Sequence, residues 1–208
     1  MRKLKHLQKE IVSCKLCSRL VNYRGQVARK KRRAFRDWEY WGKPVPSFGK
    51  PDARLLILGL APAAHGANRT GRMFTGDRSG DFLYDTLYRF GFCNQPVAQH
   101  RTDGLILFDT YITAAVHCVP PQNEPNPVEM SQCRQYLKQE LLLLKKVRVV
   151  VALGRIAWQT YLRARNELGQ PIPRPLPKFS HGDKYLVDPR MTLLASYHPS
   201  QQNTHTGR

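Results

Sequence analysis

Residues 59–77 hold the side chains best suited to chemistry in this chain. They follow the apolar run 55–58 and combine His65, Asn68 and Asp77 with arginines and repeated glycines. A buried strand that ends in a long polar loop is where α/β proteins build binding and catalytic sites, and this loop is too long for a plain connection. The glycines suggest a phosphate-binding turn. No Gly-Lys-Ser/Thr follows, however, so the pattern does not favour a nucleotide P-loop.

Five cysteines form a second group. Cys14 and Cys17 are two residues apart, which lets both sulfurs reach one metal centre, and Cys118 and Cys133 could complete a set of four thiolates. Because no export signal precedes them, we expect a reducing compartment and metal ligation rather than disulfides. Four thiolates suit zinc or an iron–sulfur cluster, and spacing leaves both open. Cys93 has no partner by spacing and is predicted to be an ordinary core or loop residue.

The chain is strongly basic. Its 208 residues include 34 Lys and Arg against 15 Asp and Glu, a formal net charge of +19. This charge favours a polyanionic partner, and nucleic acid is preferred to a membrane surface because the basic residues are interleaved with the candidate site. Residues 18–50 combine a basic run at 28–33 with aromatic side chains. This segment is either a solvated charged face over packed aromatics or a DNA contact surface.

Two absences in the sequence bear on location. No stretch of about 18 apolar residues occurs, so no membrane span is predicted. The N-terminal residues are basic but lack the apolar block of a secretory signal. We therefore expect a cytoplasmic protein.

Apolar runs that alternate with amphipathic segments predict the elements that position these groups. The expected strands are 54–59, 112–116, 147–153 and 192–196, and the expected helices are 4–12, 79–91, 127–145 and 154–165. Residues 169–178 are rich in proline and are expected to form a surface loop. The alternation favours a mostly parallel sheet covered by helices on both faces.

Local sequence signals predict where two of the helices start. Asn126 as N-cap, Pro127 at the first helical position and Glu129 three residues after the cap predict a firm start. Ser79 is expected to cap the earlier helix. Cys133 lies on the apolar face of its predicted helix, so it is expected to point inward. The alternative to metal ligation is that it is a small buried apolar residue. The predicted apolar stripes are Leu83, Leu87 and Phe90 in the earlier helix and Cys133, Leu137, Leu141 and Leu144 in the later one.

Three polar loops follow the predicted strands, at 60–78, 119–126 and 197–203. In parallel sheets the site lies beyond the carboxyl ends of the strands, where such loops meet. The strand order therefore predicts that Asp77, Asn123 and His198 lie near one another.

Several motifs together resemble the uracil-DNA glycosylase superfamily, and most closely its family 5, the broad-specificity, iron–sulfur type. They are Gly-Leu-Ala-Pro-Ala-Ala-His-Gly at 59–66, Gly-Arg-Met-Phe-Thr-Gly-Asp at 71–77, His-Pro-Ser-x-x-Asn at 198–203 and four of the cysteines. The resemblance implies a three-layer α/β/α sandwich with a central four-stranded parallel sheet. It also implies a single domain over residues 1–208, in which residues 1–50 form a basic, cluster-binding segment. By position, the ligands of a 4Fe–4S cluster would be Cys14, Cys17, Cys118 and Cys133.

The resemblance also implies site roles. Other branches carry an acidic or amide residue in the first motif. This chain has Ala61, Pro62 and Ala63 in that stretch, so Asp77 is the expected carboxylate beside the sugar. Phe74 takes the place of the aromatic residue that stacks on an extruded base. Where a related branch has an asparagine that reads the uracil edge, this chain has Ala114. Because no buried donor is then left unpaired by a different base, deaminated purines should be accepted as well as uracil.

The remaining roles carry alternatives. His198 would donate to the departing base oxygen, and Asn123 would position water or the base. The alternative role of Asn123 is to form a turn. The alternative role of Asp77 is to hold the turn before the helix. His65 is expected in a supporting place at the substrate site. Ser200, with backbone amides near residues 62 and 63, would grip phosphates.

The leading hypothesis is a monomeric DNA glycosylase that removes uracil and other deaminated bases and leaves an abasic site. Two alternatives stay open. One is a non-catalytic iron–sulfur DNA-binding module that captures modified bases, and the other is a zinc-stabilised binding protein.

Overall fold

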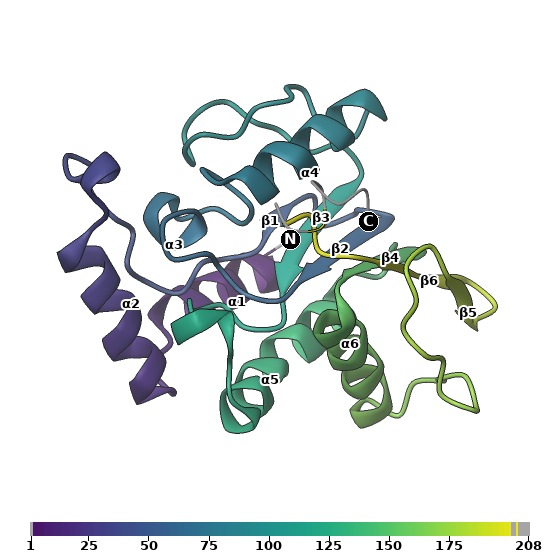
Figure 1. Cartoon of the computed structure of the whole chain (residues 1–208). Coiled ribbons are helices and arrows are strands. Elements are labelled where there is room, and N and C mark those ends of the chain that lie inside the picture. The colour runs from purple at the N-terminus through teal and green to yellow at the C-terminus, as the bar shows by residue number, and fades with distance from the viewer. Residues whose placement is uncertain (1, 201–202, 204–208) are drawn as a thin grey trace.

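The computed structural model describes residues 2–200 and residue 203, and in it a six-stranded sheet lies between helices on both faces (Figure 1). The strands are β1 (Phe48–Gly49), β2 (Leu55–Gly59), β3 (Thr110–Ala114), β4 (Val149–Leu153), β5 (Lys184–Asp188) and β6 (Met191–Ser196), in the order β1-β3-β2-β4-β6-β5. The four inner strands are parallel, as predicted, and β1 and β5 are antiparallel at the two edges. The predicted α/β class is confirmed, and the two edge strands extend the expected sheet.

Helices lie on both faces of the sheet and at one side of it (Figure 1). They are α1 (Arg2–Ser13), α2 (Ser18–Lys30), α3 (Ala67–Thr70), α4 (Arg78–Arg89), α5 (Pro127–Leu143) and α6 (Arg155–Glu167), with short 3₁₀ turns η1 (Arg33–Phe35) and η2 (Pro121–Asn123). α1, α5 and α6 pack on one face, and α4 with the segment 92–107 packs on the other (Figure 1). No described helix is long and apolar enough to cross a membrane.

The alternation of side chains along β2 divides the core in two. Leu56 and Leu58 are fully buried against the face that carries α1, α5 and α6, and Ile57 is buried against the α4 face. Successive strand residues point to opposite faces, so a strand buried on both sides reads as a continuous apolar run. Cys93 is buried in the α4 layer, which confirms its prediction as an ordinary core residue.

α5 begins as predicted and α4 does not. Asn126 Oδ1 accepts from the Glu129 amide at 2.9 Å, and the Glu129 carboxylate accepts from the Asn126 amide at 2.9 Å. The prediction of Ser79 as N-cap is wrong: the N-cap is Asp77, whose Oδ1 accepts from the Gly80 amide at 3.0 Å. The prediction of Phe90 in the buried stripe is also wrong, because this residue lies past the last helical residue and is 74% exposed.

Candidate active site

A cavity of about 270 Å³ opens beyond the carboxyl ends of β2, β3 and β6. Of the residues that the sequence nominated for catalysis or substrate binding, those that line this cavity are Ala61, Phe74, Asp77, Ala114, Asn123, His198 and Ser200. Leu60, Met73 and Ser79 line it too. Leu60 and Met73 belong to the two loop motifs, but the sequence analysis gave neither of them a role. The pattern around Ser79 indicated only a helix cap. Residues 201–202 of the last predicted loop lie outside the described residues.

His65 is the nominated residue that does not line the cavity. Its Nδ1 lies 3.0 Å from the Tyr40 hydroxyl, and its carbonyl oxygen accepts from Arg69 Nε at 2.7 Å. Burial, with the charges of Arg32 and Arg69, lowers the pKa of His65. Its contacts therefore join the site loop to the N-terminal segment.

The carboxylate of Asp77 is held at the amino end of α4. One oxygen accepts from the Gly80 amide, and the other lies against the backbone of Gly66, where a Cβ would overlap it. A helix N-terminus is a favourable place for an acidic side chain, because the first backbone N–H groups of the helix point toward it. Asp77 thus has the structural role offered as its alternative, and it also faces the cavity.

Phe74 and Asn123 both sit in the left-handed region of backbone space, with φ of 50° and 60°. Such a φ is unusual for a bulky residue, and backbone strain of this kind gathers at functional sites. The Phe74 ring lies over Gly59, where a Cβ would come within 2.8 Å of Cζ. Its centroid is 6.0 Å from that of His198, and the ring planes are 29° apart. The strained backbone thus holds the phenyl ring at the cavity wall.

His198 is the titratable ring of the cavity. Burial lowers its pKa from the ordinary histidine value, and the negative charge of Asp77 opposes that shift. The imidazole is therefore neutral at pH 7 and carries one N–H donor. The side chain of Asn203 donates to the His198 carbonyl oxygen at 2.7 Å, which ties the turn back on itself.

Two arginines of the site loop brace it instead of lining the cavity. Arg72 makes a buried bidentate pair with Asp103, at 2.7 Å for each hydrogen bond. Arg69 donates to the Gly76 carbonyl oxygen at 2.8 Å, and its guanidinium lies 3.9 Å from the ring centroid of Phe35 and 4.0 Å from that of Trp38. Phe35 and Trp38 therefore pack against Arg69. For these two residues, this favours packed aromatics over a DNA contact surface.

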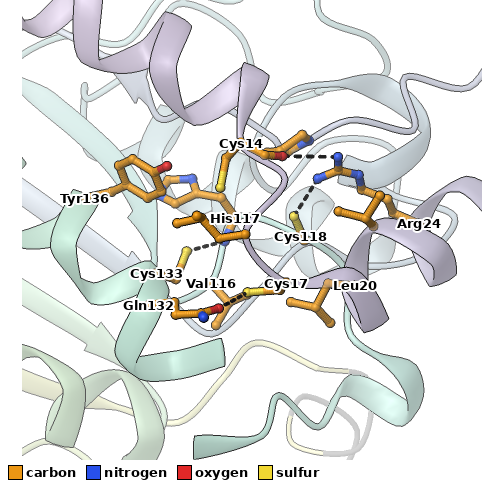
Figure 2. Close-up of a pocket in the computed structure, with 13 residues that line it drawn as sticks. Cys14, Cys17, Leu20, Arg24, Val116, His117, Cys118, Gln132, Cys133 and Tyr136 are labelled. Carbon is orange, nitrogen blue, oxygen red and sulfur yellow. Dashed lines mark hydrogen bonds between the residues drawn. The ribbon is translucent and has the colours of Figure 1, made fainter. Parts of the chain in front are cut away.

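A second cavity holds four of the cysteines (Figure 2). Cys14 follows α1, Cys17 caps α2, Cys118 lies four residues beyond β3 and Cys133 is on α5. Their sulfurs face a common space whose other walls are mainly apolar, and all are free thiols. Burial raises the pKa of Cys118 to about 11 and raises that of Cys133 further. Without a bound metal, Cys118 and Cys133 are therefore thiols at neutral pH.

Arg24 enters this cavity from α2 and was not nominated by the sequence. It is 6% exposed, and its guanidinium lies 2.9 Å from Cys118 Sγ and 3.2 Å from the Cys14 carbonyl oxygen (Figure 2). Within the described part of the chain no carboxylate comes within ion-pair distance of it. A buried cation needs an anionic partner, and here only a thiolate could supply it.

The donor set fits a thiolate-bound metal group. Four cysteine thiolates are a common ligand set of structural zinc sites and of iron–sulfur clusters. No three described histidine, cysteine, aspartate or glutamate side chains, however, are placed to hold one metal ion. A single zinc ion would require its sulfurs about 2.3 Å from one point.

Comparison with known proteins identifies the family. A family model for the uracil DNA glycosylase superfamily matches residues 46–208. The chain belongs to this superfamily. The type-5 uracil-DNA glycosylase of Mycobacterium bovis is 53% identical over 196 residues, which are 94% of this chain and 72% of the relative. The type-5 enzyme of Thermus thermophilus is 49% identical over 198 residues, 95% of this chain and 87% of the relative.

A relative of another type is more distant. The type-4 uracil-DNA glycosylase of Pyrobaculum aerophilum is 28% identical over 163 residues, 78% of this chain and 74% of the relative. The predicted resemblance to the superfamily and to its family 5 is confirmed.

Proposed function

We propose that this protein is a uracil-DNA glycosylase, a hydrolase that cleaves the N-glycosidic bond of uracil in DNA and leaves an abasic site for base-excision repair. The observation that carries the proposal is the single cavity into which Asp77, Asn123 and His198 all face. Membership of the superfamily and the type-5 relatives support it. A base inside a duplex is out of reach, so the enzyme must extrude the nucleotide into this cavity, at a cost of a few kcal/mol.

Asp77 acts beside the sugar. Cleavage of the N-glycosidic bond develops positive charge on the sugar, and a fixed carboxylate stabilises that charge and orients the attacking water. The hydrogen bond from the Gly80 amide and the contact with Gly66 hold the carboxylate in one position before substrate binds. Such preorganisation lowers the barrier because little rearrangement is needed during the reaction.

His198 acts on the leaving base. The departing base develops negative charge on its oxygen, and the neutral imidazole donates an N–H hydrogen bond to it. Phe74, whose ring lies close to that imidazole, provides the stacking surface for the base. Asn123 lines the cavity from the loop that follows β3, and its amide places water or the base.

The substrate range extends beyond uracil. Ala114 lines the cavity and offers no side-chain donor or acceptor to a base edge. A site that leaves no polar group unpaired when the base changes discriminates weakly. We propose that hypoxanthine and xanthine are excised as well.

A direct test uses oligonucleotides that carry one uracil, hypoxanthine or xanthine. Purified protein is incubated with each without added metal ions, and the strand is then treated with alkali, which breaks the chain at an abasic site. The expected result is a break at the modified position and none in a thymine control. Tight, salt-sensitive binding without alkali-labile sites would instead make the protein a non-catalytic binding module.

We further propose that Cys14, Cys17, Cys118 and Cys133 hold a 4Fe–4S cluster. The shared cavity and the buried cation of Arg24 support this ligand set. When bound, the cluster supplies thiolate–iron bonds that cross-link three segments of the chain. The thiolates would order the N-terminal segment against α5 and the loop that carries Asn123.

We propose that residues 1–208 form one domain, which acts on DNA as a monomer. We also propose that the basic segment 1–50 takes part in binding the cluster. The net charge of +19 suits a polyanionic substrate. Relatives occur in bacteria and archaea, whose DNA lies in the cytoplasm, and we propose that this protein acts there.

A further inference from the structure

A second groove, which shares no lining residue with the active-site cavity, runs between α6 and residues 172–179. Its volume is about 740 Å³. Polar and charged residues that line it are Arg155, Gln159, Arg163, Asn166, Arg174 and Lys178. Trp158 and Phe179 contribute to its apolar lining. The mechanism proposed above does not use this groove.

The charged side chains of the groove all have the same sign. Arg155, Arg163, Arg174 and Lys178 line it, and no Asp or Glu does. Each of the four is exposed, and none has an ion-pair partner among the described residues. Some arginines elsewhere on this chain are paired, as Arg72 is with Asp103. Four unpaired cations facing one groove repel one another and are suited to a polyanion.

The groove begins beside the active site. Gly154, directly before α6, lies so close to His198 that a Cβ there would be 3.9 Å from the His198 Cβ. On the other wall, Phe179 packs against Tyr197, with ring centroids 6.1 Å apart. Both walls therefore contact the segment that carries the imidazole of the cavity.

We propose that this groove holds the phosphodiester backbone of the DNA strand that flanks the extruded nucleotide. The inference rests on the proposed function and adds a path for the substrate outside the cavity. Arg155 and Arg163 are eight residues apart on one helix, about 12 Å at 1.5 Å per residue. Phosphates of one DNA strand follow one another at shorter intervals than this, so the two arginines can contact different phosphates of the same strand.

The test neutralises two arginines of the groove that do not line the active-site cavity. The double variant Arg163→Gln/Arg174→Gln removes one cation from each wall, and both side chains are exposed, so the fold should be retained. The matched control, Lys145→Gln/Lys146→Gln, removes two exposed cations that precede β4, at the amino ends of the parallel strands. Circular dichroism and thermal unfolding check that both variants fold like the wild type.

The readout is the salt dependence of the dissociation constant for a uracil-containing duplex. Each lost phosphate contact lowers the slope of log K against log salt by about 0.9. Between about 50 and 200 mM salt, the groove variant should therefore lose about twelvefold less affinity than the wild type. The control should keep most of the wild-type slope. The control should also keep the wild-type kcat at saturating DNA.

Two outcomes overturn the proposal. One is a groove variant with the wild-type salt slope. The other is an unchanged DNA slope together with a changed competition. In that case poly-glutamate, at matched charge concentration, displaces the wild-type protein from DNA but does not displace the groove variant. That result would assign the groove to an acidic polypeptide. Failure of the proposed function is seen separately, as wild-type protein that binds DNA but releases no base.

Discussion

The carboxylate of Asp77 rests against the backbone of Gly66, with no room between them for a side chain. Replacing this glycine by alanine must push the carboxylate or the loop aside. We expect Gly66→Ala to lower kcat on uracil-DNA by roughly one to two orders of magnitude, because a shift of about 1 Å in a positioned group costs about 10²-fold. Single-turnover kinetics measures the effect.

A matched glycine variant separates displacement from general damage. Gly25 lies in α2, and a Cβ there would make only an ordinary contact, 3.4 Å from Arg29 Nη1. Gly25→Ala should keep wild-type kcat and gain slight stability, since alanine favours a helix more than glycine. Equal activity in both variants would remove the Gly66 contact from the account of catalysis.

Asp77 both caps α4 and faces the cavity, and two substitutions separate these roles. Asp77→Asn keeps a good N-cap side chain but removes the charge. This variant should have a kcat about 10²–10⁴-fold lower, while its DNA affinity and thermal stability stay near those of the wild type. Asp77→Ala should lose kcat similarly and also about 1 kcal/mol of stability, because the cap is gone. Chemical denaturation and kinetics on the same preparations check both.

The opposite pattern would reassign the residue. If Asp77→Asn is fully active and Asp77→Ala is merely less stable, the carboxylate is a structural cap and another group stabilises the sugar. The turn-holding alternative would then be the whole role of Asp77.

The pKa of His198 predicts a pH dependence. Burial lowers it below the ordinary value near about 6.5, and Asp77 raises it in part. An NMR titration of the ring should therefore give a midpoint below that ordinary value in the wild type. In Asp77→Asn the midpoint should be lower still, because the opposing negative charge is removed. An unchanged midpoint would mean that the two side chains do not interact.

The same shift affects stability. Above about pH 6.5 the ring is neutral in the folded and unfolded chains, so it contributes no pH dependence. Below that pH the unfolded chain binds the proton more readily, and stability falls as the pH drops through the folded pKa. His65 is shifted in the same direction and shares the effect. Between about pH 7 and 5, His198→Asn should therefore lose less Tm than the wild type, as calorimetry would show.

Local signals predicted much of the fold, and their failures have physical reasons. The capping pattern at Asn126 and Glu129 is complete within four residues, so it determines the start of α5. Asp77 and Ser79 are both good N-cap residues, and sequence alone does not choose between them. Phe90 continues the apolar spacing of α4, but the helix ends before it. β1 is only two residues long, too short for any periodicity to appear.

Long-range partners were out of reach of such signals. The strand order brought Asp77 and His198 to one edge of the sheet, because parallel strands end together. Arg69, by contrast, is held by aromatic residues more than thirty positions earlier in a run of exposed charges. Arg24 contacts a sulfur 94 residues away. Neither arginine carries a pattern that distinguishes it from its solvated neighbours.

Arg24 gives the sharpest test of the cysteine site. Arg24→Met keeps much of the side-chain volume but removes the cation beside Cys118. The wild-type protein should be brown, with absorbance near about 400 nm from thiolate–iron charge transfer. The variant should retain less iron per chain. Any cluster that it keeps should have a more negative reduction potential, because a nearby positive charge favours the reduced form.

The control for this experiment is Arg29→Met, which removes an exposed cation from the same helix. It should retain wild-type iron content and potential, because solvent screens its charge. A colourless wild-type protein that contains zinc would contradict the cluster and favour a structural zinc site. Iron content and potential unchanged in Arg24→Met would show that the buried guanidinium does not act on the metal group.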